Sequence, residues 1–459
     1  VDFNQCAYIT GVTSIHDFPL KNVYQSSCEA IDYSAYIVKI DTRKSGQASL
    51  VYSSYIGGNG IDVGMGIAAD CDGVAYITGA TTSTSGFPIT NNGYSTKYLG
   101  GENTGFLVKI DTTKVGFSSL VYGTYLGGNG YDYASSVALD KSNNAYITGF
   151  TNSNLYFPTT SNAYIATNEN GIDYGFIIKL DTNKKGKDSL IYGTYFGGSS
   201  YDYISSVALD CNDYIYVTGV TKSEDFPVTA NAYRAKRTGE LSSTFLSKFD
   251  LSKGGKKALI YSSYLSGNGA DAGYGVVVDF NQCAYITGAT TSIAGFPITN
   301  NAYETKNCNS NGSGFFIKIN TKLSGEKSLE YGTYLCGSNL DLGSDIKVDC
   351  NGYAYIVGFT SSNDFPVSKN GYQSNFRSES YSIFLIKLDT SKNGKESLLY
   401  GTYLGGNRND FALSMALDKK LNVYITGYTE SISDFPITSN VFQAINPGGE
   451  DSTFLIKLG

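Results

Sequence analysis

The chain has 459 residues, with 39 tyrosines, 53 glycines, no tryptophan and a formal net charge of −7. This length exceeds the usual size of one hydrophobic core, so it requires several domains or one fold of repeated units. The single histidine, His16, leaves most histidine-dependent hydrolase and zinc mechanisms without their commonest side chain, and the absence of a Lys/Arg tract argues against nucleic acid as the main partner. No apolar run is long enough to form a transmembrane segment.

The dipeptide Phe-Pro recurs every 69 or 70 residues along the whole chain. A period this regular predicts one structural unit repeated seven times, and it leaves no room for a separate catalytic domain. We therefore interpret residues 1–459 as a single domain. The seven dipeptides begin at Phe18, Phe87, Phe157, Phe226, Phe296, Phe365 and Phe435.

Each unit contains four strand-like runs, which in one unit are 135–140, 144–150, 175–181 and 189–198. They are rich in Val, Ile, Tyr and Thr, and Gly, Asn and Asp bound them, as is typical of strands. No stretch keeps a helical period. The pattern predicts an all-β fold, a seven-bladed β-propeller of four-stranded antiparallel blades, with a β-solenoid as the alternative. The innermost strands are predicted to include 65–70, 135–140, 205–210, 275–279, 345–349 and 414–418.

The succession of Gly-Gly, Asp, Ala-Tyr-Ile-Thr-Gly and Phe-Pro in these units resembles the SBBP family, the bacterial β-propeller repeat. The resemblance covers the whole chain. It implies a secreted or surface-displayed propeller module. It brings no established activity and no catalytic residues to transfer.

The two ends of the chain do not complete the repeat. Val1 aligns with Leu139 and Gly459 with Asp111, so positions 112–138 of that unit have no counterpart across the ends. These positions hold one outermost strand and most of one innermost strand. The chain also starts with Val and shows no signal peptide, which favours a processed piece of a longer chain. An N-terminal extension equivalent to these positions would supply the outer strand of the last blade, and an open ring is the alternative.

The loops divide between two faces of the predicted propeller. The fourth-to-first and second-to-third connections form the face that we call top, and the other connections form the bottom. Acidic residues outnumber basic ones in the top loops, whereas the two are balanced in the bottom loops. We expect solvated, locally paired charges at the bottom and a top face that attracts cations or a basic partner.

One aspartate recurs in the Gly-Gly loop before each innermost strand. These carboxylates are candidate calcium ligands at the top of the central channel. The alternative, which the six-fold recurrence favours, is that each caps a turn by accepting backbone N–H bonds. We expect no other cofactor. The six residues are Asp62, Asp132, Asp202, Asp271, Asp341 and Asp410.

Departures from the repeat are where catalysis would have to lie. They include Glu330, Asp345 and Lys347 in strands, and an ion pair or a solvated channel wall is the interpretation we favour for the last two. His16, beside Asp17, is interpreted as a surface residue. These features do not form an asymmetric cluster of acids, so the sequence predicts a protein that is not an enzyme.

A lysine recurs near the bottom end of every third strand. An unpaired ammonium between packed sheets is costly, so we expect carboxylate or carbonyl partners, first among them the bottom-turn acids. The lysines are Lys39, Lys109, Lys179, Lys248, Lys318, Lys387 and Lys457, and the acids are Asp2, Asp70, Asp140, Asp210, Asp279, Asp349 and Asp418.

The eight cysteines contain no Cys-x-x-Cys motif, which argues against zinc or thioredoxin-like chemistry. Disulfides between Cys6 and Cys71 and between Cys283 and Cys350 would join adjacent blades. Reduced cysteines, buried as small apolar residues, are the alternative.

The second-to-third loops depart most from the repeat, so they are where a specific contact is expected. The predicted function is a non-catalytic, extracellular or cell-surface propeller that binds a protein partner or assembles with itself. The alternative is a carbohydrate-binding or carbohydrate-active propeller with its site on the top face. The candidate contact residues, expected to be exposed, are Tyr98, Arg234, Lys236, Arg237, Phe376 and Arg377.

Overall fold

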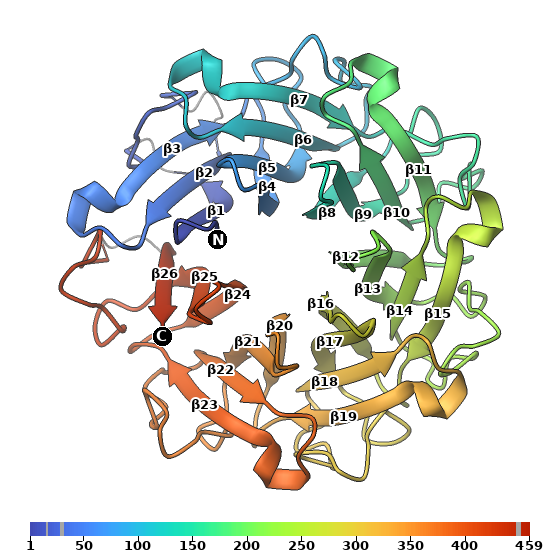
Figure 1. The fold of residues 1–459 in the computed structure, drawn as a ribbon, viewed down its shortest axis with the longest axis vertical. Helices are drawn as coiled ribbons and strands as arrows, with labels where there is room; N and C mark the ends of the chain where they lie inside the picture. Colours follow the sequence, from blue (N-terminus) through green and yellow to red (C-terminus); the bar gives the residue numbers. More distant parts are fainter. Residues whose placement is uncertain (15–16, 28–31, 447–450) are drawn as a thin grey trace. The chain divides into compact units, whose positions relative to one another are not determined.

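The computed structural model describes residues 1–14, 17–27, 32–446 and 451–459, and it shows an all-β, seven-bladed β-propeller. The strands form seven antiparallel sheets, which we call blades 1 to 7 in chain order (Figure 1). Two compact units contain them: Val1–Val207 with Asp250–Ala258, and Ala208–Phe249 with Leu259–Gly459. The fold class expected from the repeat is confirmed. The expectation of a single domain stays a prediction.

Blades 1 to 3 belong to the first unit. Blade 1 has three strands, β1 (Cys6–Thr13), β2 (Ser34–Asp41) and β3 (Leu50–Ile56). Blade 2 has four, β4 (Asp62–Ala69), β5 (Val74–Thr81), β6 (Thr104–Asp111) and β7 (Leu120–Leu126). Blade 3 has β8 (Asp132–Leu139), β9 (Ala145–Thr151), β10 (Tyr174–Leu180) and β11 (Leu190–Phe196).

The remaining blades follow in the same order. Blade 4 has β12 (Asp202–Leu209), β13 (Ile215–Thr221), β14 (Ser243–Phe249) and β15 (Leu259–Leu265). Blade 5 has β16 (Asp271–Val278), β17 (Cys283–Thr290), β18 (Ser313–Asn320) and β19 (Leu329–Leu335). Blade 6 has β20 (Asp341–Val348), β21 (Ala354–Thr360), β22 (Ser382–Leu388) and β23 (Leu398–Leu404). Blade 7 has β24 (Asp410–Leu417), β25 (Val423–Thr429) and β26 (Ser452–Leu458).

The first strand of each complete blade begins earlier than the sequence predicts. In blade 2, Asp62 already pairs with Thr81, and a β-bulge between Gly64 and Gly66 then shifts the register. The bulge interrupts the alternation of side chains, which explains why the pattern concealed the start of the strand. The strand ends at Ala69, so the bottom-turn acid that follows lies in the turn.

Short 3₁₀ helices, which the sequence analysis did not predict, occupy six third-to-fourth connections. Each is one turn long and carries no helical period for a sequence pattern to reveal. Coiled ribbons mark them at the ends of the outer strands in Figure 1. They are η1 (Gly46–Ser49), η2 (Gly116–Ser119), η3 (Gly186–Ser189), η4 (Gly255–Ala258), η5 (Gly325–Ser328) and η6 (Gly394–Ser397).

Hydrophobic clusters join the facing sheets inside each unit. In the first unit, Tyr76 and Leu107 of blade 2 pack with Val137 and Phe176 of blade 3. The second unit has matching clusters between blades 4 and 5, 5 and 6, and 6 and 7. Inside each unit, middle strands are therefore buried on both faces, and their bottom ends meet at the junctions between neighbouring blades. Among the described residues, no helix is long and apolar enough to cross a membrane.

Candidate functional site

The bottom turn between the first and second strands is built around its aspartate. In blade 5, Asp279 Oδ1 accepts the backbone N–H groups of Asn281 and Cys283, each at 2.9 Å. Its other oxygen accepts the hydroxyl of Tyr285 at 3.0 Å. Gln282 completes the turn in the left-handed region, at φ 66°. The carboxylate therefore closes the turn and fixes the tyrosine that follows it.

Each third-strand lysine lies directly opposite that tyrosine in the sheet register, as Tyr285 does opposite Lys318. The seven ammonium groups lie 4.6–5.3 Å from a second-strand tyrosine ring centroid, which is a cation–π contact. The pairs are Lys39 with Tyr8, Lys109 with Tyr76, Lys179 with Tyr146, Lys248 with Tyr216, Lys318 with Tyr285, Lys387 with Tyr355 and Lys457 with Tyr424.

The bottom-turn acids are confirmed as partners of three of these lysines. The ion pairs are Lys39 with Asp2 at 3.7 Å, Lys179 with Asp140 at 3.2 Å and Lys387 with Asp349 at 3.9 Å. Lys248 donates to the side-chain carbonyl of Gln282 at 3.0 Å, the other kind of partner expected, whereas Lys109 donates to the Thr182 hydroxyl at 3.1 Å. Burial lowers the pKa of both of these lysines. The aromatic contact was missed, although aligning the repeats places a tyrosine in every second strand.

Blade 5 departs from this arrangement because Glu330 stands on β19 beside the lysine. Lys318 Nζ lies 2.9 Å from Glu330 Oε2, and Asn320 Nδ2 donates to the other oxygen at 2.8 Å. Burial alone would raise the pKa of Glu330, but the hydrogen bonds from Lys318 and Asn320 outweigh it and the pKa is lowered. Glu330 therefore holds Lys318 as a charged pair on its own blade.

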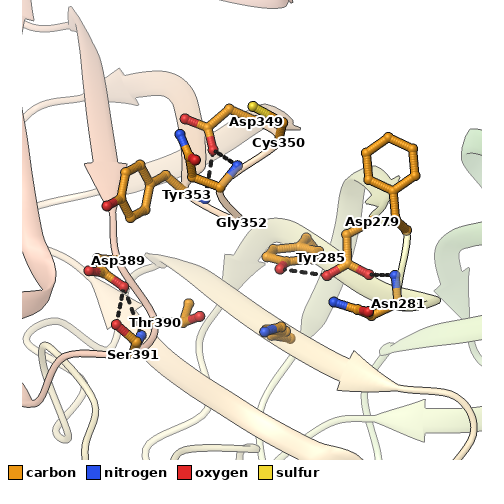
Figure 2. A pocket seen from close by; sticks show the side chains of 13 residues that line it. Asp279, Asn281, Tyr285, Asp349, Cys350, Gly352, Tyr353, Asp389, Thr390 and Ser391 are labelled. Atoms are coloured by element: carbon orange, nitrogen blue, oxygen red, sulfur yellow. Dashed lines mark hydrogen bonds between the residues drawn. The ribbon is translucent and has the colours of Figure 1, made fainter.

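A cavity of about 340 Å³ opens at the bottom of blades 5 and 6, and we call it the bottom cavity. Its walls come from the turn at 279–281, from β17 and β18, from the turn at 349–353 and from 389–391 after β22. Figure 2 shows the Asp279, Asp349 and Asp389 carboxylates around it, with the Tyr285 ring between them. Phe280 stands at the rim with 79% of its surface exposed.

The position of the lysine distinguishes this cavity from the matching place in blades 1 and 2. A Cβ placed on Gly73 would lie 3.2 Å from Lys39 Nζ, so the ammonium fills that junction. A Cβ placed on Gly352, the matching turn glycine of blade 6, would meet only the Tyr285 hydroxyl, at 3.7 Å. Lys318 therefore does not reach this turn as Lys39 reaches Gly73, and it stays at the cavity wall.

The six top-loop aspartates are buried singly, and each accepts the amide of a Gly-Gly loop glycine at 2.7–2.9 Å. In blade 3, for example, Thr151 and Ser153 donate to Asp132 and Gly128 N–H donates to its second oxygen. Burial raises the pKa of Asp132 to about 7 and those of Asp271, Asp341 and Asp410 to about 6. These hydrogen bonds match the capping interpretation. Within the described residues, no group of three or more potential ligands surrounds a metal position, and calcium stays a prediction.

The charges inside β20 form an ion pair, as expected. Lys347 Nζ lies 2.6 Å from Asp345 Oδ1. The second oxygen of Asp345 accepts the Met415 amide at 2.8 Å and the Ser414 hydroxyl at 3.0 Å, so it joins β20 to β24. The prediction for His16 falls outside the described residues.

The expected exposure of the six top-loop residues is wrong for four of them. Tyr98 and Phe376 are half-buried and pack edge-on against Tyr125 and Tyr403. Arg234 is half-buried and donates to the Ser266 and Gly295 carbonyls. 

Arg237 is half-buried as well, donates to the Leu241 carbonyl and pairs with Glu224 at 3.7 Å. These side chains hold their loops against neighbouring strands. The sequence differences between units did not reveal this structural role. Only Lys236 and Arg377 of the six are exposed. The six are spread over three loops and do not come together in the cavity.

The suggested disulfides are wrong: Cys6, Cys71, Cys283 and Cys350 are free thiols. A disulfide instead joins Cys308 and Cys336, connecting a top loop of blade 5 to the end of β19. Cys308 and Cys336 each occur once in the repeat alignment, which hid the pairing. Cys28 lies outside the described residues.

The seven sheets and their recurring caps define a β-propeller built from one repeated unit. The chain carries the SBBP β-propeller repeat: the family model matches residues 121–157, 191–227 and 399–436. The resemblance inferred from the sequence is thus confirmed. No curated protein matches the chain.

Several solved structures are similar to this chain at low identity. A protein of unknown function from Bacteroides caccae is 8% identical with a TM-score of 0.34, covering 80% of this chain and 89% of its own. A gluconolactonase from Xanthomonas campestris is 9% identical with a TM-score of 0.30, covering 70% and 78%. A PQQ-bound aldose sugar dehydrogenase from Streptomyces coelicolor is 10% identical with a TM-score of 0.35, covering 92% and 97%.

Proposed function

We propose that this chain is a non-catalytic binding module of a secreted or cell-surface protein, and that the bottom cavity is its binding site. The observation that carries the proposal is a cavity at the junction of blades 5 and 6, where the lysine does not reach across as it does between blades 1 and 2. Residues that serve the fold recur in every unit, whereas Glu330, which holds Lys318 on its own blade, stands in one unit only.

Binding is favoured over catalysis because the cavity carboxylates already hold structural hydrogen bonds. Asp279 and Asp349 each accept two turn amides and a tyrosine hydroxyl. Asp389 accepts the amide and hydroxyl of Ser391. A general acid or base must change its protonation state during turnover, and these carboxylates would break a turn by doing so. The Cys308–Cys336 disulfide supports an oxidising compartment.

A carbohydrate ligand is the second candidate. The exposed Phe280 ring and the Tyr353 ring both line the cavity beside polar groups, a combination that suits sugar rings. On this alternative the site lies at the bottom and not on the top face.

The experiment compares binding with turnover on the same preparations. Arrays of glycans and of peptides are probed with the wild-type chain, with Phe280→Ser at the cavity, and with Lys236→Ser/Arg377→Ser at the exposed top loops. We expect binding that the cavity variant loses and the top-loop variant keeps. Release of product from aryl glycosides or sugar lactones, at a rate proportional to protein concentration and lost in Phe280→Ser, would overturn the non-catalytic proposal. Loss of binding in the top-loop variant alone would place the site on the top face.

A further inference from the structure

The junction between blades 1 and 2 shows what the bottom end of this fold holds when it is filled. Lys39 Nζ lies 3.1 Å from Thr112 Oγ1, 3.7 Å from Asp2 and 4.8 Å from the centroid of the Tyr8 ring. Thr112 passes its own hydrogen to the Gly73 carbonyl at 2.6 Å. A hydroxyl, a carboxylate and a ring face thus form a receptor for one primary ammonium group. Blades 2 and 3 repeat it, with Lys109 at 3.1 Å from Thr182.

The junction between blades 5 and 6 has the same three groups, but Lys318 pairs with Glu330 on its own blade. Asp279, Tyr285 and Thr390 take the places of Asp2, Tyr8 and Thr112, and all three line the bottom cavity. Thr112 is 4% exposed, whereas Thr390 is only half-buried. Lys318 is held by Glu330 at the cavity wall, and no lysine atom lies within 4 Å of a Cβ placed on Gly352.

We infer that the bottom cavity binds a primary alkylammonium group, at the position that Lys39 gives its own ammonium in blade 1. This inference rests on the proposed binding function and names its ligand chemistry. The ammonium would donate to the Thr390 hydroxyl beside Tyr285, with its alkyl stem running toward exposed Phe280.

Charge and shape both select this group. Asp279, Asp349 and Asp389 line the cavity, and its one lysine is already neutralised by Glu330, so the local charge is negative. An anion is repelled, and a neutral sugar gains nothing from the field. A guanidinium is planar and wider than the ammonium that donates to the matching threonine in two other junctions of the chain.

The test titrates the full chain with defined probes at low ionic strength, followed by NMR. The probes are n-butylammonium, N-acetyl-lysine methylamide, and the norleucine and arginine analogues of the latter. We expect saturable binding of the two primary amines and at least tenfold weaker binding of the norleucine and arginine compounds. Equal binding of the lysine and norleucine compounds would overturn the inference.

Two variants test whether the amine binds in the bottom cavity. Glu330→Val copies Val51 of blade 1, frees Lys318 to return over Thr390, and should weaken both primary amines at least tenfold while the fold is retained. Val51→Glu with Asp41→Asn copies blade 5 into blade 1 and should add a second equivalent of bound amine. The second change is needed because Asp41 stands in blade 1 where Asn320 stands in blade 5. Asn320 donates a hydrogen bond to Glu330, whereas the Asp41 carboxylate would repel the new glutamate. Unchanged affinity in Glu330→Val contradicts the inference, whatever the reciprocal variant does.

The same titrations distinguish the two possible sources of a primary amine, a small molecule and a lysine of a protein partner. Similar affinity for n-butylammonium and for a lysine within a peptide identifies a small amine as the ligand, and at least tenfold tighter binding of the peptide identifies the lysine of a protein partner. Partner binding on the arrays that survives Glu330→Val, without any amine binding, leaves the binding module standing and overturns the ammonium site. Substrate turnover overturns the binding module itself.

Discussion

Blades 1 and 5 begin from the same run, VDFNQCAYITG, at 1–11 and 278–288, yet their lysines end in different places. Lys39 reaches across to blade 2 and is 7% exposed. Lys318 turns back to Glu330 on its own blade and leaves a cavity behind. The turn, the tyrosine and the lysine are the same in both.

The difference therefore originates outside the residues that the two blades share. Position 51 is Val on β3, and the matching position on β19 is Glu330. One carboxylate at that position competes with the neighbouring blade for the ammonium. Its ion pair with Lys318, at 2.9 Å and supported by Asn320, is shorter than the 3.7 Å pair of Lys39 with Asp2. A residue that does not line the cavity decides whether the cavity exists.

Removing the two lysines is expected to give the largest difference. Lys39→Met leaves the buried Asp2 carboxylate without its ion pair, so we expect a loss of about 3 kcal/mol in the free energy of unfolding. Lys318→Met removes a more exposed pair, and about 1 kcal/mol is expected. Denaturant titrations followed by circular dichroism measure both. Equal losses would mean that the filled and the open junction hold their lysines alike.

Acid is expected to strengthen the contribution of the top-loop aspartates to stability, whereas it weakens the contribution of Glu330. Burial raises the pKa of Asp132 to about 7, so the folded chain takes up a proton as the pH falls through 7 while the unfolded chain does not. Stability from this group therefore rises as the pH falls from 8 to 5, by about 2 kcal/mol. Asp132→Asn keeps the shape of the side chain but removes its titratable carboxyl group. The free energy of unfolding of this variant should therefore change less over this pH range. Parallel pH profiles for the two proteins would contradict the assignment.

The repeat predicted the parts of the molecule that recur. Seven Phe-Pro dipeptides gave the blade number, and the alternation of apolar residues gave the strand order, because every blade solves the same packing problem. The bulge at Gly64–Gly66 and the six 3₁₀ turns were missed, since both interrupt a period instead of extending it.

The candidate site could not be predicted from the sequence, for a related reason. Glu330 was visible as a departure from the repeat, but its effect depends on how far Lys318 can turn, and a sequence does not show side-chain direction. Variation in the top loops pointed to Tyr98 and Phe376, which instead pack against the strands. Variation shows where the fold permits change, and only coordinates show whether the new side chain faces solvent or a neighbour.

The smallest expected effect is the pH dependence of Glu330→Val. Hydrogen bonds from Lys318 and Asn320 lower the pKa of Glu330 below its ordinary value of 4.5 despite its burial. The pair therefore stabilises the fold above that pH and loses this contribution as the pH falls through the folded-state pKa. Wild type should exceed Glu330→Val by about 1 kcal/mol at pH 7, a partly exposed pair being screened by solvent, and by less at pH 3. Denaturant titrations at the two pH values measure this difference, and Leu399→Val, at the matching position of blade 6, serves as the control that should show no such pH dependence. A difference that grows toward pH 3 would show that Glu330 is not paired in the folded chain, and the open cavity would then need another cause.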